Sequence, residues 1–355
     1  MEKVRIGMIG LGGVAHYGHL AGYLESTGYE ITAVCDINEE HLHSMGDECG
    51  VPMDHRFTDY RDLIACEDVD AVDIATWNSV HCEIAKAAAL AGKPFSVEKP
   101  VGMNYAESYD LQQTAAEKKV PSFVCLSWRY RPYTRYVKYL ISGGKLGKLY
   151  HIYVRCIKES GLWPGRKREW RFDKSRAASG VLGDLGSHMI DIVRFWGQEF
   201  TSVYANSGII IKERPSEETG EILPVDTDDW CNMIAELESG VSCTINLTRC
   251  ATTVSDIIQF EVYGEKGRLV YTYEGGEQSI LFVDNETKKS EWLTPPEEFN
   301  AIQSQSYINL VQGIEDEYTA KIEQGVACQA VIDAALRSTE EHRVVTIAEI
   351  TGECK

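Results

Sequence analysis

The chain has 355 residues, which is too long for one ordinary core, and its 44% hydrophobic and 25% charged residues are typical of a globular protein of two domains. Lys and Arg number 35 against 54 Asp and Glu, and the net charge of -19 repels phosphate backbones, so we expect no nucleic-acid partner. No apolar run is long enough to span a bilayer, and residues 1–6 lack the apolar segment of a secretion signal. We therefore expect no membrane partner and a cytoplasmic location.

The first third of the chain alternates short β-branched runs with helical patterns. Strands are predicted at Val4–Ile9, Glu30–Cys35, Ala71–Ala75, Pro94–Val97 and Pro121–Ser127. Helices are predicted from the Gly-rich turn to roughly Glu25, and at Glu39–Cys49, Tyr60–Cys66, His81–Ala91 and Tyr105–Lys118. This alternation predicts parallel strands joined by right-handed crossovers, with helices on both faces, in an α/β domain over residues 1–125.

The pattern changes near residue 125. Helices are predicted at Tyr133–Ile141, Asp184–Trp196, Tyr307–Gln324 and Ala327–Glu341, and a strand at Tyr150–Ile157. From Thr201 to Val283 the chain is strand after strand, with runs at Trp230–Glu238, Val241–Thr248, Ile257–Tyr263, Arg268–Tyr273 and Ser279–Val283. We predict an α+β domain over residues 126–355, with a largely antiparallel sheet, helices on one face, and last helices able to pack back on the first domain.

A glycine-rich turn between the first strand and the first helix indicates a nucleotide site. Gly10 permits the tight turn, Gly12 lets the backbone approach a pyrophosphate, and Ala15 keeps the helix close to the strand. Asp36 ends the second strand about 20 residues beyond the motif, where it can accept hydrogen bonds from an adenosine ribose and would repel a 2′-phosphate. No Arg or Lys follows at Ile37 or Asn38, so the sequence predicts a Rossmann domain that binds NAD rather than NADP.

A lysine stands where a cofactor cleft is expected. Glu98-Lys99-Pro100 follows a buried type of strand, and the carboxyl ends of parallel strands face the cofactor. Low-dielectric walls and an oxidised nicotinamide would both lower the pKa of the Lys99 amine toward a useful range. An ordinary lysine at a strand end, with its charged tip in water, explains the tripeptide equally well.

Asp184 and His188 are four residues apart on one predicted helix and therefore share a face. An imidazole can take a hydroxyl proton as hydride leaves the carbon, and a neighbouring carboxylate can orient it or bind substrate hydroxyls. The alternative is a helix N-terminal Asp above a packed His. We expect no metal site, because these two residues have no third ligand near them in the sequence, and the 11 cysteines form no CxxC pair or Cys/His cluster.

Several short motifs, in this order and spacing, resemble the glucose–fructose oxidoreductase, inositol dehydrogenase and rhizopine catabolism (Gfo/Idh/MocA) family. The resemblance runs from the first strand to the last helix. Two positions depart from it, since many members have Pro in place of Trp77 and Asn in place of Ser127. The matching pieces are Gly10–Ala15, Thr76-Trp77-Asn78 with His81, Glu98-Lys99-Pro100, Arg129-Tyr130 before Pro132, Trp170-Arg171, and Gly183-Asp184 with Gly186 and His188.

The resemblance implies a Rossmann domain followed by an open-faced sheet domain, assembled through the sheet into a homodimer or homotetramer. It implies a catalytic set in which His188 accepts the proton, Lys99 hydrogen-bonds the reacting oxygen and Asp184 binds the neighbouring hydroxyl. The cofactor contacts that we expect are Gly10, Gly12, Gly13, Val14, Ala15, Asp36, Ile37, Thr76, Trp77, Asn78, His81 and Glu98.

Aromatic and basic residues before the catalytic helix bear on the substrate. Aromatic faces suit the apolar faces of pyranose or cyclitol rings, and Arg can bind hydroxyls or a carboxylate. The basic segment Arg166–Arg176 admits an anionic substrate such as a uronate, contact with another subunit, or a solvated loop paired with acids. The substrate contacts that we expect are Arg129, Tyr130, Trp163, Trp170 and Arg171.

The sequence thus predicts an NAD-dependent dehydrogenase that moves a hydride between nicotinamide and a secondary hydroxyl of a sugar, sugar acid or inositol. Two alternatives remain open. One is a redox-neutral glycosidase that oxidises the sugar transiently, eliminates the aglycone and reduces the product again. The other is a non-catalytic NAD-sensing regulator, against which the joint presence of Lys99, Asp184 and His188 argues.

Overall fold

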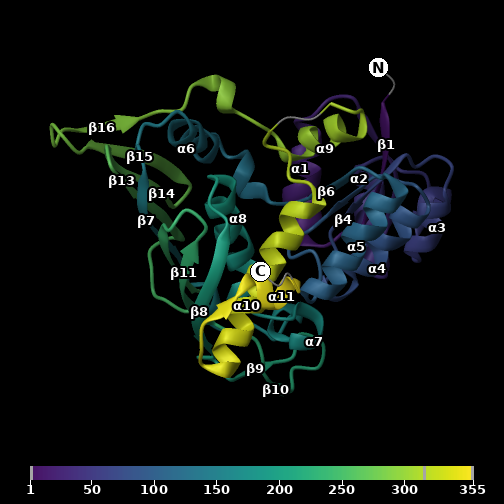
Figure 1. The fold of residues 1–355 in the computed structure, drawn as a ribbon. Coiled ribbons are helices and arrows are strands. Elements are labelled where there is room, and N and C mark those ends of the chain that lie inside the picture. The colour runs from purple at the N-terminus through teal and green to yellow at the C-terminus, as the bar shows by residue number, and fades with distance from the viewer. Residues whose placement is uncertain (1–2, 315–316, 353–355) are drawn as a thin grey trace. The chain divides into compact units, whose positions relative to one another are not determined.

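The computed structural model describes residues 3–314 and 317–352. The chain divides into two compact units, the first containing Met1–Ser127 and Ala301–Val326, the second Trp128–Asn300 and Ala327–Lys355. Their helices and strands are labelled in Figure 1. No helix within the described ranges combines the length and the apolar character that crossing a membrane requires.

The first unit is built on a parallel sheet whose strands follow the order β3-β2-β1-β4-β5-β6. Every pairing described within it is parallel. This is the doubly wound order of a Rossmann sheet, and it confirms the predicted fold class. The strands are β1 (Val4–Ile9), β2 (Tyr29–Cys35), β3 (Arg56–Phe57), β4 (Ala71–Ile74), β5 (Phe95–Val97) and β6 (Ser122–Val124).

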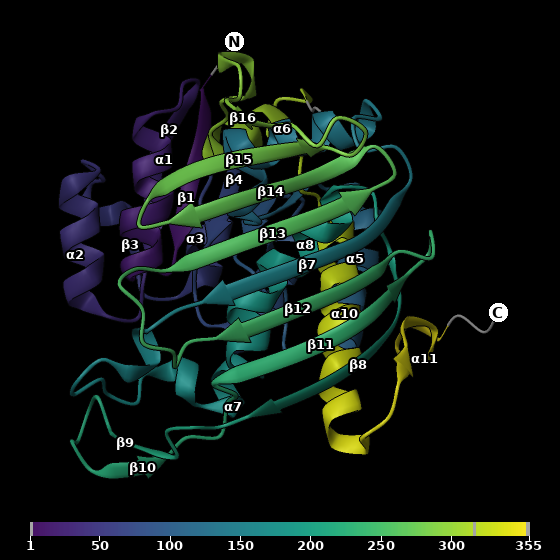
Figure 2. The same cartoon turned by 90° about the vertical axis from the view of Figure 1, so that its left-hand side faces the viewer.

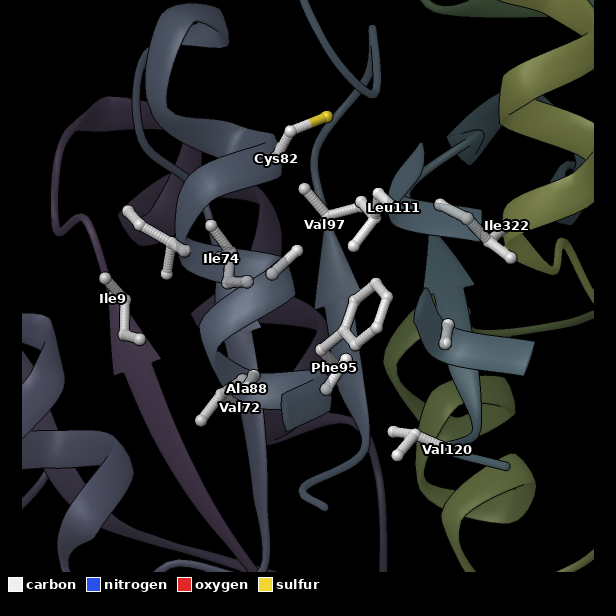
Figure 3. Close-up of a cluster of buried hydrophobic side chains, with 14 of the residues drawn as sticks. Ile9, Val72, Ile74, Cys82, Ala88, Phe95, Val97, Leu111, Val120 and Ile322 are labelled. Atoms are coloured by element: carbon white, nitrogen blue, oxygen red, sulfur yellow. The ribbon is translucent and has the colours of Figure 1, made fainter. Parts of the chain in front are cut away.

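Helices complete the first unit and bury the central strands, so that β4 and β5 are buried at every position. Figure 3 shows part of this core, with Phe95 among aliphatic side chains of the neighbouring strands and helices. Tyr307 ties the returning segment to the sheet by donating its hydroxyl to the carbonyl of Val72 at 2.7 Å. The helices are α1 (Ala21–Leu24), α2 (Glu39–Glu48), α3 (Tyr60–Ala65), α4 (Asn78–Leu90), α5 (Tyr105–Lys118) and α9 (Gln303–Val311).

The second unit contains a mixed sheet with the order β16-β15-β14-β13-β7-β12-β11-β8-β17, and Figure 2 shows it face-on with α8 behind it. Only β7 and β12 pair in parallel among the described strands of this sheet, which confirms the largely antiparallel prediction. Burial alternates along the strands, so one face is covered and the other open. The strands are β7 (Leu149–Ile157), β8 (Phe200–Gly208), β11 (Trp230–Leu237), β12 (Ser242–Thr248), β13 (Ile257–Gly264), β14 (Gly267–Glu274), β15 (Glu277–Asp284), β16 (Ser290–Leu293) and β17 (Val345–Thr346).

The sequence patterns missed a short hairpin between β8 and β11, and they misplaced the boundary between the last two long helices. The hairpin pairs β9 (Glu213–Pro215) with β10 (Ile222–Pro224). The remaining helices are α6 (Pro132–Ser142), α7 (Lys174–Ala177), α8 (Ser187–Phe195), α10 (Ile322–Glu341) and α11 (Ile347–Thr351).

The continuous helix predicted at Tyr307–Gln324 is wrong. Helix α9 ends at Val311, and Gly313 follows in the left-handed conformation with φ +75°. The N–H of Gly313 donates to the carbonyl of Leu310, and the N–H of Ile314 donates to that of Asn309. This is the Schellman arrangement that ends a helix, and α10 begins only at Ile322.

The packing of Phe95 in the core of the first unit leads to a prediction about stability. We expect Phe95→Ala to lower the free energy of unfolding by ~3–5 kcal/mol, because it removes a fully buried ring and leaves a cavity. Urea denaturation followed by circular dichroism measures the change. The control is Leu90→Ala at a position 56% exposed on α4, and we expect it to change stability by less than about 0.5 kcal/mol. Equal losses in the two variants would contradict this core.

Candidate active site

The glycine loop after β1 leaves room for a ligand at one glycine and none at another. Gly10 has φ +84°, and a Cβ there would lie 2.7 Å from the carbonyl oxygen of Ala75, so no other residue fits. A Cβ on Gly12 would meet no heavy atom within 4 Å. Ala15 is fully buried where the following helix packs against the strands. The loop therefore has the close packing and the open side that a bound pyrophosphate requires.

Asp36 follows β2 and is held against this loop. Its Oδ2 accepts the backbone N–H of Leu11 at 2.6 Å, and its Oδ1 accepts that of Asn38 at 2.8 Å. Each carboxylate oxygen keeps a further lone pair with which a ribose hydroxyl can bond. Ile37 is 76% exposed beside it and offers an apolar face to an adenine ring. Two of the predicted cofactor contacts, Asp36 and Ile37, thus follow one another beside the glycine loop.

The loop after β4 carries the next group of predicted cofactor contacts. The hydroxyl of Thr76 is buried and has no hydrogen-bond partner within the described residues, so it is ready to bind a ligand. Trp77 is 36% exposed at the start of α4, whereas Asn78 is buried in its first turn. An indole here can stack on a ring or shield the site from water.

His81 on α4 connects this loop to the one after β5. Its Nδ1 lies 2.9 Å from the carbonyl oxygen of Pro100, and its Nε2 lies 3.1 Å from that of Thr76. Burial lowers the pKa of His81, so the ring is neutral at pH 7 and donates one N–H. His81 therefore stabilises the conformation of the two loops, since its buried ring contacts the main chain of both.

Lys99 lies two residues after β5, and the contacts of its backbone are described by the structure. Its side chain is partly exposed, and its backbone N–H donates to Oε2 of Glu98 at 3.2 Å. The peptide bond between Lys99 and Pro100 is cis. Lys99 belongs to the first unit, whereas Asp184 and His188 belong to the second.

Asp184 and His188 are the two partly exposed positions of a buried helix. Leu182–Gly186 is a π-helical segment that runs directly into α8, and every other residue from Val181 to Trp196 is buried. A π-helical turn is rare and is frequently found at functional sites. Because the spacing of four residues keeps both side chains on the same side of the helix, they can contact one bound molecule.

Asp228 fixes the start of this helix, and the sequence motifs did not include it. Its carboxylate oxygens accept the backbone N–H groups of Gly180 at 2.6 Å and Leu182 at 2.9 Å. A Cβ on Gly180 would lie 1.9 Å from the carbonyl oxygen of Asp228, so this close approach demands glycine. Burial raises the pKa of Asp228, while the two N–H groups favour its charged form. A separation of 48 residues hides this contact from any local pattern.

Arg171, one of the predicted substrate contacts, lies beside Asp184. The Arg171 Nε is 4.0 Å from Oδ2 of Asp184, and its Nη1 donates to Glu169 at 3.3 Å. The guanidinium stacks over the indole of Trp170 at 4.3 Å from the ring centroid. Trp163 is 58% exposed on the same loop. The arrangement offers an aromatic face, a cation and a carboxylate within one short segment.

Arg129 and Tyr130 are placed differently from the other predicted substrate contacts. Arg129 is 3% exposed, and its Nε and Nη2 both donate to the fully buried carboxylate of Asp191. Tyr130 is 5% exposed. An Arg–Asp pair of this kind holds α8 to the segment before α6, which gives the Arg-Tyr motif a structural role in the second unit.

Lys158, which follows β7, is a further charged group close to Asp184. It pairs with Asp256 at 2.8 Å. Burial opposes its charge, but Asp256 and, more weakly, Asp184 raise the pKa of Lys158 above its ordinary value. No motif marked this residue, because a lysine at a strand end has no distinctive spacing.

The first unit thus fits a dinucleotide, because an open glycine loop lies next to the Asp36 carboxylate and to a threonine hydroxyl that has no partner within the described residues. These features define a dinucleotide-binding protein of the Rossmann class. Residues 4–125 match the model of an oxidoreductase family with an NAD-binding Rossmann fold, and residues 134–270 match the C-terminal domain of the GFO/IDH/MocA proteins. Since the matches span more than half of the chain, it belongs to the Gfo/Idh/MocA family of NAD-binding oxidoreductases, which confirms the resemblance.

Individual relatives show the same similarity. Levoglucosan dehydrogenase of Pseudarthrobacter phenanthrenivorans is 28% identical over 313 residues, covering 83% of this chain and 80% of that protein. Myo-inositol 2-dehydrogenase of Thermotoga maritima is 26% identical over 357 residues, covering 98% of this chain and 100% of that protein. A structure of levoglucosan dehydrogenase with NADH and L-sorbose has a TM-score of 0.87 and 26% identity, covering 98% of this chain and 99% of that one.

Alanine substitutions at Gly12 and Gly10 are expected to impair different properties, NADH affinity in the first case and stability in the second. In Gly12→Ala, the added methyl group would occupy the open space in which we place the pyrophosphate. Because overpacking costs ~1–3 kcal/mol, the dissociation constant for NADH should rise about 10- to 100-fold. The melting temperature should not fall, since the methyl group meets no heavy atom of the protein within 4 Å. Gly10→Ala should instead lower the melting temperature, because it combines a left-handed residue with a clash. NADH fluorescence titration and thermal unfolding measure the two effects.

Gly18→Ala is the control for both glycine variants, because a Cβ at this helical position meets no heavy atom within 4 Å. It should leave NADH affinity unchanged and stability unchanged or higher. NADH binding by Gly12→Ala at the affinity of the parent chain would contradict the placement of the pyrophosphate.

Proposed function

We propose that this chain catalyses the reversible, NAD-dependent oxidation of a secondary hydroxyl of a sugar, sugar acid or inositol. The observation that carries the proposal is the pair Asp184 and His188, which interrupts an otherwise buried helix with two partly exposed side chains able to handle a proton and a hydroxyl. Membership of an NAD-binding oxidoreductase family supports it. So do the names of the relatives, which are dehydrogenases of levoglucosan and myo-inositol.

The first unit would hold the cofactor through the glycine loop and Asp36, with Thr76 and Trp77 at the loop after β4. NAD, when bound, supplies the redox chemistry by taking a hydride from the alcohol carbon. What remains for the chain is to orient the alcohol, exclude water and move one proton.

We assign that proton to His188. A neutral imidazole is a suitable base near pH 7, and a position on a helix anchored by Asp228 keeps it in one place. Lys99 would donate a hydrogen bond to the reacting oxygen and stabilise the charge that forms on it. Asp184 would accept a hydrogen bond from the neighbouring hydroxyl and so select a polyol over a simple alcohol.

The charges of the basic segment favour an uncharged substrate. Arg166 and Arg171 both pair with Glu169, and Arg168 pairs with Asp173. Because these guanidiniums already have carboxylate partners, less of their charge is available to a uronate. The exposed indole of Trp163 and the partly exposed one of Trp170 can pack against the apolar face of a sugar or cyclitol ring.

An absorbance screen tests this function. The purified chain with NAD should produce NADH at 340 nm with at least one member of a panel of anhydrosugars, aldoses, uronates and inositols. Glycosides of the same sugars should be included. Cleavage of a glycoside with no net NADH would indicate the redox-neutral glycosidase instead, and NADH binding without any turnover would indicate the regulator.

Lys99→Ala is expected to reduce kcat by about 100-fold or more, the loss seen when one oxyanion donor is removed. NADH affinity and melting temperature should stay close to those of the parent chain, since the side chain is partly exposed. The exposed salt bridge of Lys86 on α4 provides the control, and Lys86→Ala should leave kcat unchanged. Normal turnover by Lys99→Ala would refute the assigned role.

We further propose that a second copy of this chain packs on the open face of the sheet. Tyr153, Ile234 and Tyr204 lie in register across β7, β12, β11 and β8, with Thr244 between the first two. In-register residues share a face, and these three large side chains are 42%, 61% and 41% exposed. Large exposed side chains that gather on a sheet face are typical of a protein interface.

Light scattering after gel filtration tests this assembly. The parent chain should elute as a dimer or tetramer, and Ile234→Lys should shift it toward the monomer by placing a charge on this face. Ile222→Lys, at a position 62% exposed on the β9–β10 hairpin, should leave the mass unchanged. A monomeric parent chain would rule the interface out.

A further inference from the structure

A bridge of ionisable groups lies inside the first unit. His19, on the π-helical segment Ala15–Leu20, is 4% exposed. Its Nδ1 lies 2.8 Å from Oδ2 of Asp73 on β4, and its Nε2 lies 3.0 Å from Oε1 of Glu98 after β5. Asp73 and Glu98 are themselves 3% and 14% exposed. One imidazole therefore joins two carboxylates that come from separate strands.

The bridge satisfies both carboxylates only when each ring nitrogen carries a proton. Burial favours the neutral ring, but the adjacent Asp73 raises the pKa of His19 well above its ordinary value. Burial would raise the pKa of Glu98, but the hydrogen bond from His19 lowers it. Burial also raises the pKa of the neighbouring Cys125 thiol to about 11, so it adds no charge at pH 7. Ionised groups in a core are costly unless their partners are complete.

The bridge ends at the main chain of Lys99. Glu98 uses Oε1 for His19 and Oε2 for the backbone N–H of Lys99, at 3.0 and 3.2 Å. The next peptide is held from another direction, because His81 lies 2.9 Å from the carbonyl oxygen of Pro100. Two buried histidines, one charged and one neutral, thus constrain the backbone on either side of Lys99.

We propose that His19 is a positioning residue, which is anchored on Asp73 and fixes the Glu98 carboxylate and, through it, the backbone of Lys99. The proposal rests on the proposed function only for the consequence, since Lys99 is there the donor to the reacting oxygen. His19 itself touches no substrate. A displacement of about 1 Å at a reacting group costs about 100-fold in rate, so the bridge is expected to affect kcat rather than binding.

A metal ion is the competing explanation for this cluster. His19, Asp73 and Cys125 offer three ligand atoms within 4.8 Å of one another, and such donors suit zinc. Direct hydrogen bonds account for the geometry without an ion, because both ring nitrogens already face a carboxylate oxygen at 2.8 and 3.0 Å. Metal analysis of the purified chain decides between the two.

Two amide variants of His19 test its contacts with Asp73 and with Glu98 independently. The amide nitrogen of Asn overlays Nδ1 of His, and that of Gln overlays Nε2, so His19→Asn keeps the donor to Asp73 and His19→Gln keeps the donor to Glu98. We expect His19→Asn to lower kcat about 10- to 100-fold with little change in KM or in NADH affinity. His19→Gln should stay within about threefold of the parent kcat. Equal losses in the two variants would overturn the proposal, because the contact with Glu98 would then be irrelevant.

Hydrogen exchange gives a readout that needs no activity. Exchange in a peptide covering residues 95–103 should be faster in His19→Asn than in His19→Gln, because the carboxylate that accepts the Lys99 N–H is released. If no substrate is oxidised, the proposed function fails, but this comparison still supports or overturns the bridge. If His19→Asn does not fold, Glu98→Ala replaces it, because it removes the carboxylate altogether, and exchange at the parent rate would overturn the proposal. So would one equivalent of zinc that is retained by the parent chain and lost in Cys125→Ala.

Discussion

Carboxylates that accept main-chain N–H groups hold the functional segments of both units. Asp36 takes the N–H of Leu11 in the glycine loop, and Asp228 takes those of Gly180 and Leu182 at the start of the helix that bears His188. Such groups are costly to bury, and the N–H donors compensate for the lost water. Some of the acidic residues of this chain therefore have a structural role, and the conformation of each segment depends on its carboxylate.

Both functional helices also begin with a π-helical segment. The first, Ala15–Leu20, places His19 against the ends of β4 and β5, and the second, Leu182–Gly186, contains Asp184. A π-helical turn is wider than an α-helical one and persists only where surrounding contacts stabilise it. Gly186 shows such a contact, because a Cβ there would lie 3.0 Å from Leu247 on β12. Packing against the sheet thus fixes the helix geometry next to Asp184 and His188.

The fold class and the binding of NAD by the first unit could be predicted from the sequence because their signals are local. Strand periodicity, the glycine motif and the spacing to Asp36 each lie within one strand–helix–strand unit. The contacts of Asp228 and of His19 with Asp73 join residues 46–54 positions apart, and no periodicity encodes them. The helix predicted at Tyr307–Gln324 shows the opposite failure, because a helical pattern continued through Gly313, a glycine that ends the helix.

Arginines from several segments pack around one ring of the loop before the helix that bears His188. The guanidiniums of Arg166, Arg214 and Arg249 all lie over the ring of Phe172, at 4.9, 4.3 and 4.3 Å from its centroid. Arg214 also donates to the carbonyl of Gly161, and Arg249 pairs with the buried Asp229. These cations stabilise the loop by contacts within the unit. Under the proposed function, selection among substrates would fall to the exposed aromatic faces and to hydroxyl contacts at Asp184, which would suit an uncharged ring with vicinal hydroxyls better than a uronate.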